Sequence, residues 1–363
     1  MWIKPDRLFD GETLRTEVAV RVEDGCLVEI GQGVAAHAIP GTITPGFVDL
    51  QINGGGGVLL NNDPSPEGIA TIAAAHRRFG TVAFMPTVIT DAPGVMEAAA
   101  DAVIASTAPE VIGLHIEGPH ISIEMRGTHS EKYVRPFEQT TLTTVEKLRA
   151  AGRDVIVTIA PEVVSQADVS ALAGTGAIVS IGHTIADAET VENAFAAGAT
   201  CGTHLFNAMS QMTARQPGAV GAFLSSSVSA GIIADRHHVD LRLVALAFRS
   251  NPGVFLVSDA MATVGGPDSF SLYGQTIRLV DGCLLNSEGN LAGAHTTLES
   301  GIQNLTVAGV EVDEALRSVT SKPANVIGRN DLGRLVGRDA RDVLVLKTDL
   351  SVRHTLADLI ERL

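Results

Sequence analysis

The sequence has few of the residues that mark secreted or membrane-spanning proteins. Its 363 residues include three cysteines, Cys26, Cys201 and Cys283, which lie far apart and lack the spacing of metal ligands. A sparse, odd number of cysteines argues against a disulfide framework and indicates a reducing compartment. No run of about 18 apolar residues is long enough to span a bilayer, and residues 1–6 do not resemble a signal peptide. We therefore expect a soluble, cytoplasmic protein with no membrane partner.

Positive charge and aromatic side chains are also scarce. The chain has 26 Lys and Arg residues against 41 Asp and Glu residues, for a formal net charge of −15. Because nucleic-acid binding depends on neutralising phosphates, this balance argues against a nucleic-acid partner. Aromatic residues make up 4% of the chain, whereas hydrophobic residues make up 45% and glycines number 37. Such a composition suits buried parallel strands and closely packed helices.

Apolar runs of strand length alternate with helical stretches through the middle of the chain. Residues 111–117 are one example, because the run ends at the carboxylate of Glu117 and Gly118-Pro119 then breaks the chain. Eight such runs predict an α/β protein with a (β/α)8 TIM-type barrel. After the eighth run we expect a polar hairpin insertion at 270–291 and helices at 297–328. The predicted barrel strands are 47–53, 81–85, 111–117, 155–159, 177–181, 200–203, 229–233 and 254–258.

The two ends of the chain lack this alternation. Residues 18–22 alternate between apolar and polar, and a turn at 23–25 leads into residues 27–30, which is a hairpin pattern. Residues 332–346 also read as short strands. Because chain termini often lie close together, we expect residues 1–44 and 331–363 to form one small β-sandwich domain. Residues 45–330 are then expected to form the barrel.

Polar residues recur where the predicted barrel strands end, which is the active-site face of this fold. Glu117, His183 and His204 close the third, fifth and sixth strands. A carboxylate and two imidazoles suit Zn²⁺ or Fe²⁺, and three protein ligands leave the open position of a catalytic site. Each residue taken alone is more simply explained as a polar side chain with a local hydrogen bond. Their joint placement favours a metal site.

Other polar residues share this face. Asp259 closes the eighth strand, where it could take a proton from the attacking water and return it to a leaving amine, or could instead cap the next helix. Gln51 and Asn53 end the first strand on one face. Amides are poor metal ligands, so these two are expected to donate hydrogen bonds near the metal or to cap the strand end. His115 is a rival ligand, but its deeper position favours packing.

The loops carry three further candidates. Backbone NH groups after the sixth strand, together with Arg215, can hold a phosphate, although a lone arginine is usually only a surface residue. His129, in the long loop after the third strand, could polarise a substrate carbonyl, although a loop histidine is more often merely exposed. His238, after the seventh strand, offers a cationic donor.

Nine short motifs follow one another along the barrel: Pro45-Gly46-Phe47-Val48-Asp49, His115-Ile116-Glu117-Gly118-Pro119, Gly127-Thr128-His129, Gly182-His183-Thr184, Thr203-His204-Leu205-Phe206-Asn207-Ala208-Met209, Pro217-Gly218, His238-Val239-Asp240, Ser258-Asp259-Ala260 and Leu291-Ala292-Gly293. Together they closely resemble the N-acetylglucosamine-6-phosphate deacetylases of the amidohydrolase superfamily. They span nearly the whole barrel in order, and that family also builds a β-domain from both termini.

The resemblance implies an activity and a set of residue roles. A member of that family would hydrolyse the acetamide of N-acetyl-D-glucosamine 6-phosphate to D-glucosamine 6-phosphate and acetate, in amino-sugar catabolism or cell-wall recycling. One divalent metal, Zn²⁺ first and Fe²⁺, Co²⁺ or Mn²⁺ as alternatives, would bind Glu117, His183 and His204. Asp259 would act as general base and then general acid, and His129 would support the acetamide carbonyl. The chain would form a homodimer with the phosphate site shared across the interface. The substrate-binding residues would be Gln51, Asn53, Thr128, His129, Asn207, Ala208, Arg215, His238, Leu291, Ala292 and Gly293.

One departure from many amidohydrolases bears on the metal site. These often carry a His-x-His pair at the end of the first strand, where this chain has Gln51 and Asn53. In this respect the chain resembles the branch of the family that uses a single metal. Two alternatives stay open. The enzyme could act on N-acetylgalactosamine 6-phosphate or another amide, because loop shape decides the epimer. A non-catalytic scaffold protein is the other alternative, although it would not need an intact set of metal ligands.

Overall fold

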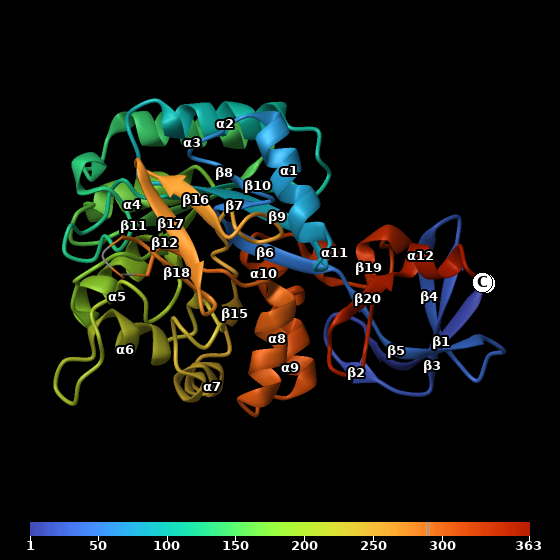
Figure 1. Ribbon diagram of the computed structural model, residues 1–363. Helices are drawn as coiled ribbons and strands as arrows, with labels where there is room; N and C mark the ends of the chain where they lie inside the picture. Colours follow the sequence, from blue (N-terminus) through green and yellow to red (C-terminus); the bar gives the residue numbers. More distant parts are fainter. Residues whose placement is uncertain (288, 290) are drawn as a thin grey trace.

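Eight parallel strands form a barrel, and a smaller sheet from both ends of the chain lies beside it (Figure 1). The computed structural model describes residues 1–287, 289 and 291–363. The barrel strands pair in chain order from first to last, which confirms the predicted fold class. These strands are β6 (Phe47–Ile52), β9 (Thr81–Ile89), β10 (Gly113–Glu117), β11 (Asp154–Ile159), β12 (Ile178–Ile181), β13 (Ala199–Gly202), β14 (Ser229–Ile232) and β15 (Val254–Leu256).

Helices follow the barrel strands and cover the outside of the barrel (Figure 1). Local sequence sets their ends: the side chain of Ser65 accepts a hydrogen bond from Gly68 at the start of α1, and Gly198, in the left-handed conformation, ends α5. Among the described residues, no helix has the length and apolar character needed to cross a bilayer. The helices between barrel strands are α1 (Pro66–Arg77), α2 (Val95–Ala105), η1 (Glu131–Tyr133), α3 (Gln139–Ala150), α4 (Gln166–Gly174), α5 (Ala188–Ala197), α6 (Gly218–Leu224) and α7 (Leu241–Ser250).

The segments after the last barrel strand follow the prediction in most places. The polar insertion is a three-stranded antiparallel sheet of β16 (Ser269–Leu272), β17 (Gln275–Val280) and β18 (Cys283–Leu285). Residues 288 and 290 of the predicted insertion lie outside the described residues. The helical prediction is confirmed by α8 (Leu298–Val307), α9 (Val312–Arg317) and α10 (Ser321–Val326). A short hairpin of β7 (Gly54–Gly55) and β8 (Val58–Leu59) follows the first barrel strand.

The terminal sheet joins the two ends of the chain. Its strand order is β20-β19-β5-β1-β3-β4, with β2 paired to β1, and β19 lies antiparallel to β5. The predicted β-domain from both termini is therefore present, as one seven-stranded sheet. Its elements are β1 (Trp2–Phe9), β2 (Leu14–Arg15), β3 (Val18–Glu23), β4 (Cys26–Gln32), β5 (His37–Pro45), β19 (Val343–Leu346), β20 (Val352–Thr355) and α12 (Leu356–Ile360).

The prediction of short strands across 332–346 was wrong for most of that segment. It contains α11 (Asn330–Gly333) and η2 (Ala340–Asp342), and only β19 is a strand. Gly333 packs directly on α10, since an added Cβ there would lie 2.5 Å from Ser321 Cα. Farther on, Gly337 donates a backbone hydrogen bond to Leu27 in β4, and Ala340 donates one to Gly25 in the turn before β4. With the bond that Leu27 donates to Arg338, they form an isolated bridge between Cys26 and Asp339, which does not extend into a ladder.

A buried carboxylate lies at the seam between the first and last barrel strands, β6 and β15. Asp49 accepts hydrogen bonds from the backbone NH groups of Gln51 (3.1 Å) and Ser258 (3.3 Å). Asp259 closes the same seam by donating its backbone NH to the carbonyl of Gln51 at 3.0 Å. Burial raises the pKa of Asp49 to about 7. The hydrogen bonds from Ser258 and Gln51 lower this pKa, but by less than burial raises it.

This pKa predicts a pH-dependent contribution to stability. The folded protein keeps Asp49 protonated up to a pKa of about 7, whereas the unfolded chain ionises it near 3.8. The wild-type free energy of unfolding should therefore lose up to roughly 4 kcal/mol at this site as pH rises through that window. Asp49→Asn cannot ionise, so thermal unfolding should show it gaining stability relative to wild type from about pH 4 to 7. Parallel stability curves for the two proteins would contradict the prediction.

Candidate active site

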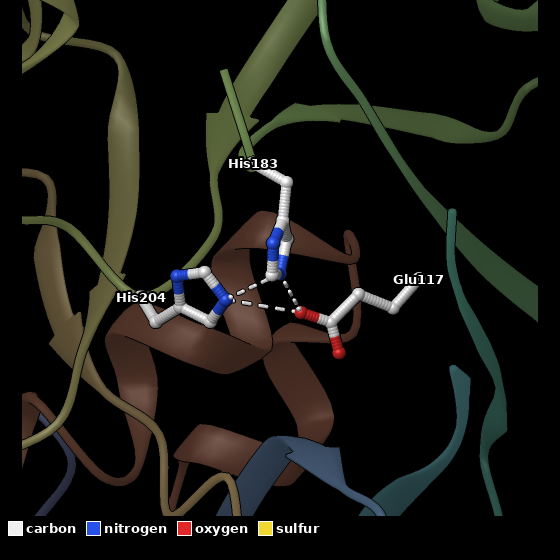
Figure 2. A group of neighbouring side chains, drawn as sticks. All are labelled: Glu117, His183 and His204. Atoms are coloured by element: carbon white, nitrogen blue, oxygen red, sulfur yellow. Dashed lines mark hydrogen bonds and ion pairs between the residues drawn. The ribbon is translucent and has the colours of Figure 1, made fainter. Parts of the chain in front are cut away.

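Glu117, His183 and His204 converge at the carboxyl end of the barrel (Figure 2). Glu117 Oε1 lies 3.0 Å from Nε2 of each histidine, and the two Nε2 atoms lie 3.0 Å from each other. Glu117 is the last residue of β10, and the histidines follow β12 and β13. All three side chains are buried. The structure thus brings the predicted ligand set together in one cluster.

The chemistry of these donors fits a divalent cation. Met125 O accepts a hydrogen bond from His183 Nδ1 at 2.8 Å, and because a carbonyl can only accept, Nδ1 carries the proton. When the ring is neutral, as a metal ligand must be, Nε2 of His183 presents a lone pair toward the cluster; when the ring is protonated, Nε2 donates to Glu117 instead. A second imidazole nitrogen and a carboxylate oxygen face the same point. Carboxylate and imidazole ligands with an outer partner on one histidine are typical of catalytic zinc sites.

Burial and the neighbouring charges shift the pKa values of the cluster in opposite directions. Burial alone would raise the pKa of Glu117, but hydrogen bonds from His183 and His204 outweigh it and hold that pKa well below its usual value. Burial alone would lower the pKa of His204, but the hydrogen bond and charge of Glu117 raise it. For Asp259, burial and the charge of Glu117 raise the pKa to about 6, against opposing contributions from His204, His238 and Asn53. The two carboxylates therefore differ in character, with Glu117 held ionised.

The backbone turns sharply where the strands deliver these side chains. His183, His204 and Asp259 have φ values of 48°, 35° and 50°, in the left-handed region that residues other than glycine seldom adopt. Such conformations cost of order 1–3 kcal/mol each and tend to occur at functional sites. Here each one ends a barrel strand and directs its side chain toward the shared site.

The two amides at the end of the first strand connect the two carboxylates. Gln51 Nε2 lies 3.2 Å from Glu117 Oε2 and 3.0 Å from Asp259 Oδ1. Asn53 Nδ2 donates to the same Asp259 Oδ1 at 2.7 Å. All four side chains are buried. The amides therefore fix the orientation of Asp259, and both of their hydrogen bonds fall on one of its oxygens.

Two further histidines line the pocket and are each held through one ring nitrogen. His129 Nδ1 lies 2.8 Å from Thr90 Oγ1, and its ring lies 4.4 Å from that of His183. Burial, followed by the charge of His183, lowers the pKa of His129 well below its usual value. His238 Nδ1 lies 2.6 Å from Asp235 Oδ2. In both rings the other nitrogen has no hydrogen bond from the described part of the chain.

His115 does not join the cluster. Its Nδ1 lies 3.0 Å from Leu50 O and its Nε2 lies 2.7 Å from Thr158 Oγ1, so both nitrogens are occupied. Thr158 continues a buried chain of hydroxyl contacts, at 2.7 Å to Thr203 and from there at 2.6 Å to Ser180. This series of contacts links β10, β11, β12 and the residue after β13. It fixes the relative positions of the strands that carry the three candidate ligands.

One pocket contains most of the residues predicted from the sequence. Of that set, Gln51 and Ala292 are buried but do not line the pocket, and Arg215 is exposed in a separate hollow beside α5. Sequence reasoning missed three apolar lining residues, Ile89, Ile233 and Met261, although the first two stand at or next to strand ends. The predicted residues in the lining are Asn53, Glu117, Thr128, His129, His183, His204, Asn207, Ala208, His238, Asp259, Leu291 and Gly293.

The chain is similar to known proteins over nearly its whole length. The sequence profile of the Amidohydrolase family matches residues 42–360. An N-acetylgalactosamine-6-phosphate deacetylase from Shewanella sp. (strain ANA-3) is 37% identical, covering 93% of this chain and 90% of the relative. An N-acetylglucosamine-6-phosphate deacetylase from Homo sapiens is 34% identical, covering 98% and 89%. The crystal structure of N-acetylglucosamine-6-phosphate deacetylase from Pasteurella multocida superposes with a TM-score of 0.90 at 30% identity, covering 97% of this chain and 96% of that one.

The ligand assignment predicts the effect of removing one imidazole. His183→Ala should bind Zn²⁺ at least about 100-fold more weakly than wild type, because one of three donors is lost. Competition with a chromophoric chelator and elemental analysis would measure this. His238→Ala is the matched control, because His238 lines the same pocket but binds Asp235 instead of the cluster. Unchanged affinity in His183→Ala would remove this residue from the ligand set.

Proposed function

The chain belongs to the amidohydrolase family, and from that premise we propose that it is a metal-dependent deacetylase of N-acetyl-D-glucosamine 6-phosphate, releasing acetate and D-glucosamine 6-phosphate. The family resemblance read from the sequence motifs is confirmed. One observation carries the proposal: Asp259 lines the same pocket as Glu117, His183 and His204. An acid–base group beside a set of metal ligands is the arrangement that amide hydrolysis requires. A scaffold protein would not need it.

We assign the metal to Glu117, His183 and His204. A divalent cation bound there, Zn²⁺ or another first-row metal, supplies the Lewis acid that makes water a nucleophile near neutral pH. A single ion is expected, because Gln51 and Asn53 present amide groups where a second ion would need stronger donors. These amides already donate to the carboxylates, which leaves them as organisers of the site.

Asp259 is assigned the proton transfers. It takes a proton from the attacking water and then delivers a proton to the leaving nitrogen. In the site without a cation, burial and the charge of Glu117 raise the pKa of Asp259 to about 6, so the carboxylate is mainly ionised near neutral pH and still able to hold a proton. Both amide hydrogen bonds fall on Oδ1, so Oδ2 is the oxygen that carries the proton. His129 is assigned to the acetamide carbonyl, where charge develops.

Substitution of Asp259 tests the assignment. Asp259→Asn keeps the shape of the side chain but cannot accept the proton, so kcat should fall by about 10²–10⁴-fold with metal content unchanged. Acetate release from N-acetylglucosamine 6-phosphate and elemental analysis would be measured on the same preparation. A chelator should abolish the wild-type activity, and added Zn²⁺ should restore it. Full activity in Asp259→Asn would reject its role.

A second substrate is favoured by one observation. The relative from Shewanella, which is named for the galactosamine sugar, is 37% identical, against 34% for the human glucosamine enzyme. The two sugars are epimers that differ at one hydroxyl group, and the reacting acetamide is the same. Parallel measurement of kcat/KM on the two sugar phosphates would decide which one this enzyme prefers.

We propose that the phosphate is held by Asn207, Ala208 and His238, with Arg215 supplied by the other subunit of a homodimer. The first three line the pocket. Arg215 does not, and it lies exposed on the loop between β13 and α6. An arginine in that position is able to bind a phosphate in a neighbouring copy, where bidentate contacts would be favourable.

A shared phosphate site predicts complementation. Arg215→Ala should raise KM about tenfold or more with a smaller change in kcat, because it removes binding without touching the reacting atoms. Mixed dimers of Arg215→Ala with Asp259→Asn subunits should regain activity, because one of the two pockets then has both residues. If mixing recovers no activity while each variant still forms dimers, Arg215 does not act across the interface.

A further inference from the structure

We propose that Thr90 is a positioning residue that fixes the ring tautomer of His129, so that His129 presents an N–H group to the substrate carbonyl. Thr90 directly follows β9 and is 1% exposed, and His129 is 4% exposed. The hydroxyl oxygen of Thr90 lies 2.8 Å from His129 Nδ1. The inference rests on the proposed function, which places the acetamide carbonyl at His129.

The single proton of the Thr90 hydroxyl group decides which tautomer of His129 the contact favours. A hydroxyl group has one proton to donate. Thr90 Oγ1 has two acceptors within reach, His129 Nδ1 at 2.8 Å and the carbonyl oxygen of Glu117 at 3.4 Å. Hydrogen bonds of the O–H···O type normally fall between about 2.5 and 3.0 Å, so the contact with Glu117 is a weak competitor. The proton therefore goes to Nδ1.

A proton donated to Nδ1 fixes the rest of the ring. Nδ1 must then be the bare nitrogen of the neutral imidazole, and the ring proton lies on Nε2. Nε2 has no hydrogen bond from the described part of the chain, and His129 lines the pocket. The ring thus offers a donor there. The opposite tautomer would offer only a lone pair, which would repel the oxygen of a carbonyl instead of stabilising it.

The surroundings of Thr90 hold the residue in place from two sides, one at its hydroxyl group and one at its backbone. Gly118 has a φ of +80°, and a Cβ at that position would lie 2.1 Å from Thr90 Oγ1, so only glycine leaves room for the hydroxyl. On the other side, the phenol of Tyr273 donates a hydrogen bond to the carbonyl oxygen of Thr90. Tyr273 lies in the turn between β16 and β17, so the hairpin insertion supports His129 through Thr90.

Two substitutions of Thr90 separate the effect of its hydroxyl group from the effect of its side-chain shape. Thr90→Val keeps the branched side chain but removes the proton, and kcat should fall about 10–100-fold with little change in KM. Thr90→Ser restores the hydroxyl and should recover most of kcat. Thr141→Val is the matched control, because Thr141 makes a buried 2.7 Å contact with His120 Nε2 outside the pocket. It should cost stability but leave kcat unchanged.

Nitrogen NMR of the histidine rings gives a readout that does not depend on turnover. In the wild-type protein with ¹⁵N-labelled histidine, His129 should show the Nε2–H tautomer, with its signals assigned by their loss in His129→Gln. Thr90→Val should lose this preference and Thr90→Ser should keep it. An Nδ1–H tautomer in wild type, or wild-type kcat and an unchanged tautomer in Thr90→Val, would overturn the inference. A wild-type protein that releases no acetate would instead reject the proposed function, and the NMR result would still decide the role of Thr90.

Discussion

The convergence of a carboxylate oxygen and two imidazole nitrogens, each 3.0 Å from the others, is the constraint on which the rest of the structure depends. Groups with lone pairs repel at this distance unless a proton or cation lies between them. A proton on either imidazole or a bound cation meets this need, and the barrel holds the three atoms close enough for both. The parallel register of the sheet fixes the positions of β10, β12 and β13, and the left-handed backbone of both histidines directs their side chains toward the site. The buried series of hydrogen bonds from His115 to Ser180 connects these strands.

The amides at the first strand give this site its two different carboxylates. Two neighbouring carboxylates in equal surroundings would share a proton, and neither would have a fixed role. Glu117 receives the hydrogen bonds of two histidines, whereas Asp259 receives those of Gln51 and Asn53 and feels the charge of Glu117. One carboxylate becomes a permanent anion and the other becomes able to exchange a proton. This division of roles also depends on the seam, where Asp49 aligns the backbone of Gln51 with that of Ser258.

The site residues that could be predicted from the sequence are those at the ends of the barrel strands. Each barrel strand is an apolar run, and the residues at its carboxyl end must face the common rim, so Glu117, His183 and His204 could be grouped without coordinates. Sequence reasoning failed where contacts join loops. Thr90 reaches His129 across 39 positions and Tyr273 reaches Thr90 across 183, with no spacing rule to reveal either contact. The strand prediction at 332–346 failed for a related reason, because an isolated bridge to the distant start of β4 leaves no alternating pattern.

The site divides into a half fixed by strands and a half supplied by loops. The proposed metal ligands and the proposed proton carrier stand at strand ends, where the sheet limits their movement. His129 and Leu291 come from loops, and Nδ1 of His129 is held by Thr90, which Gly118 and the hairpin that carries Tyr273 support. Hydrolysis of the acetamide is common to both epimeric sugars, so the strand-borne half does not need to distinguish them. Discrimination must arise where the sugar hydroxyls meet loops, which can vary while the barrel stays the same.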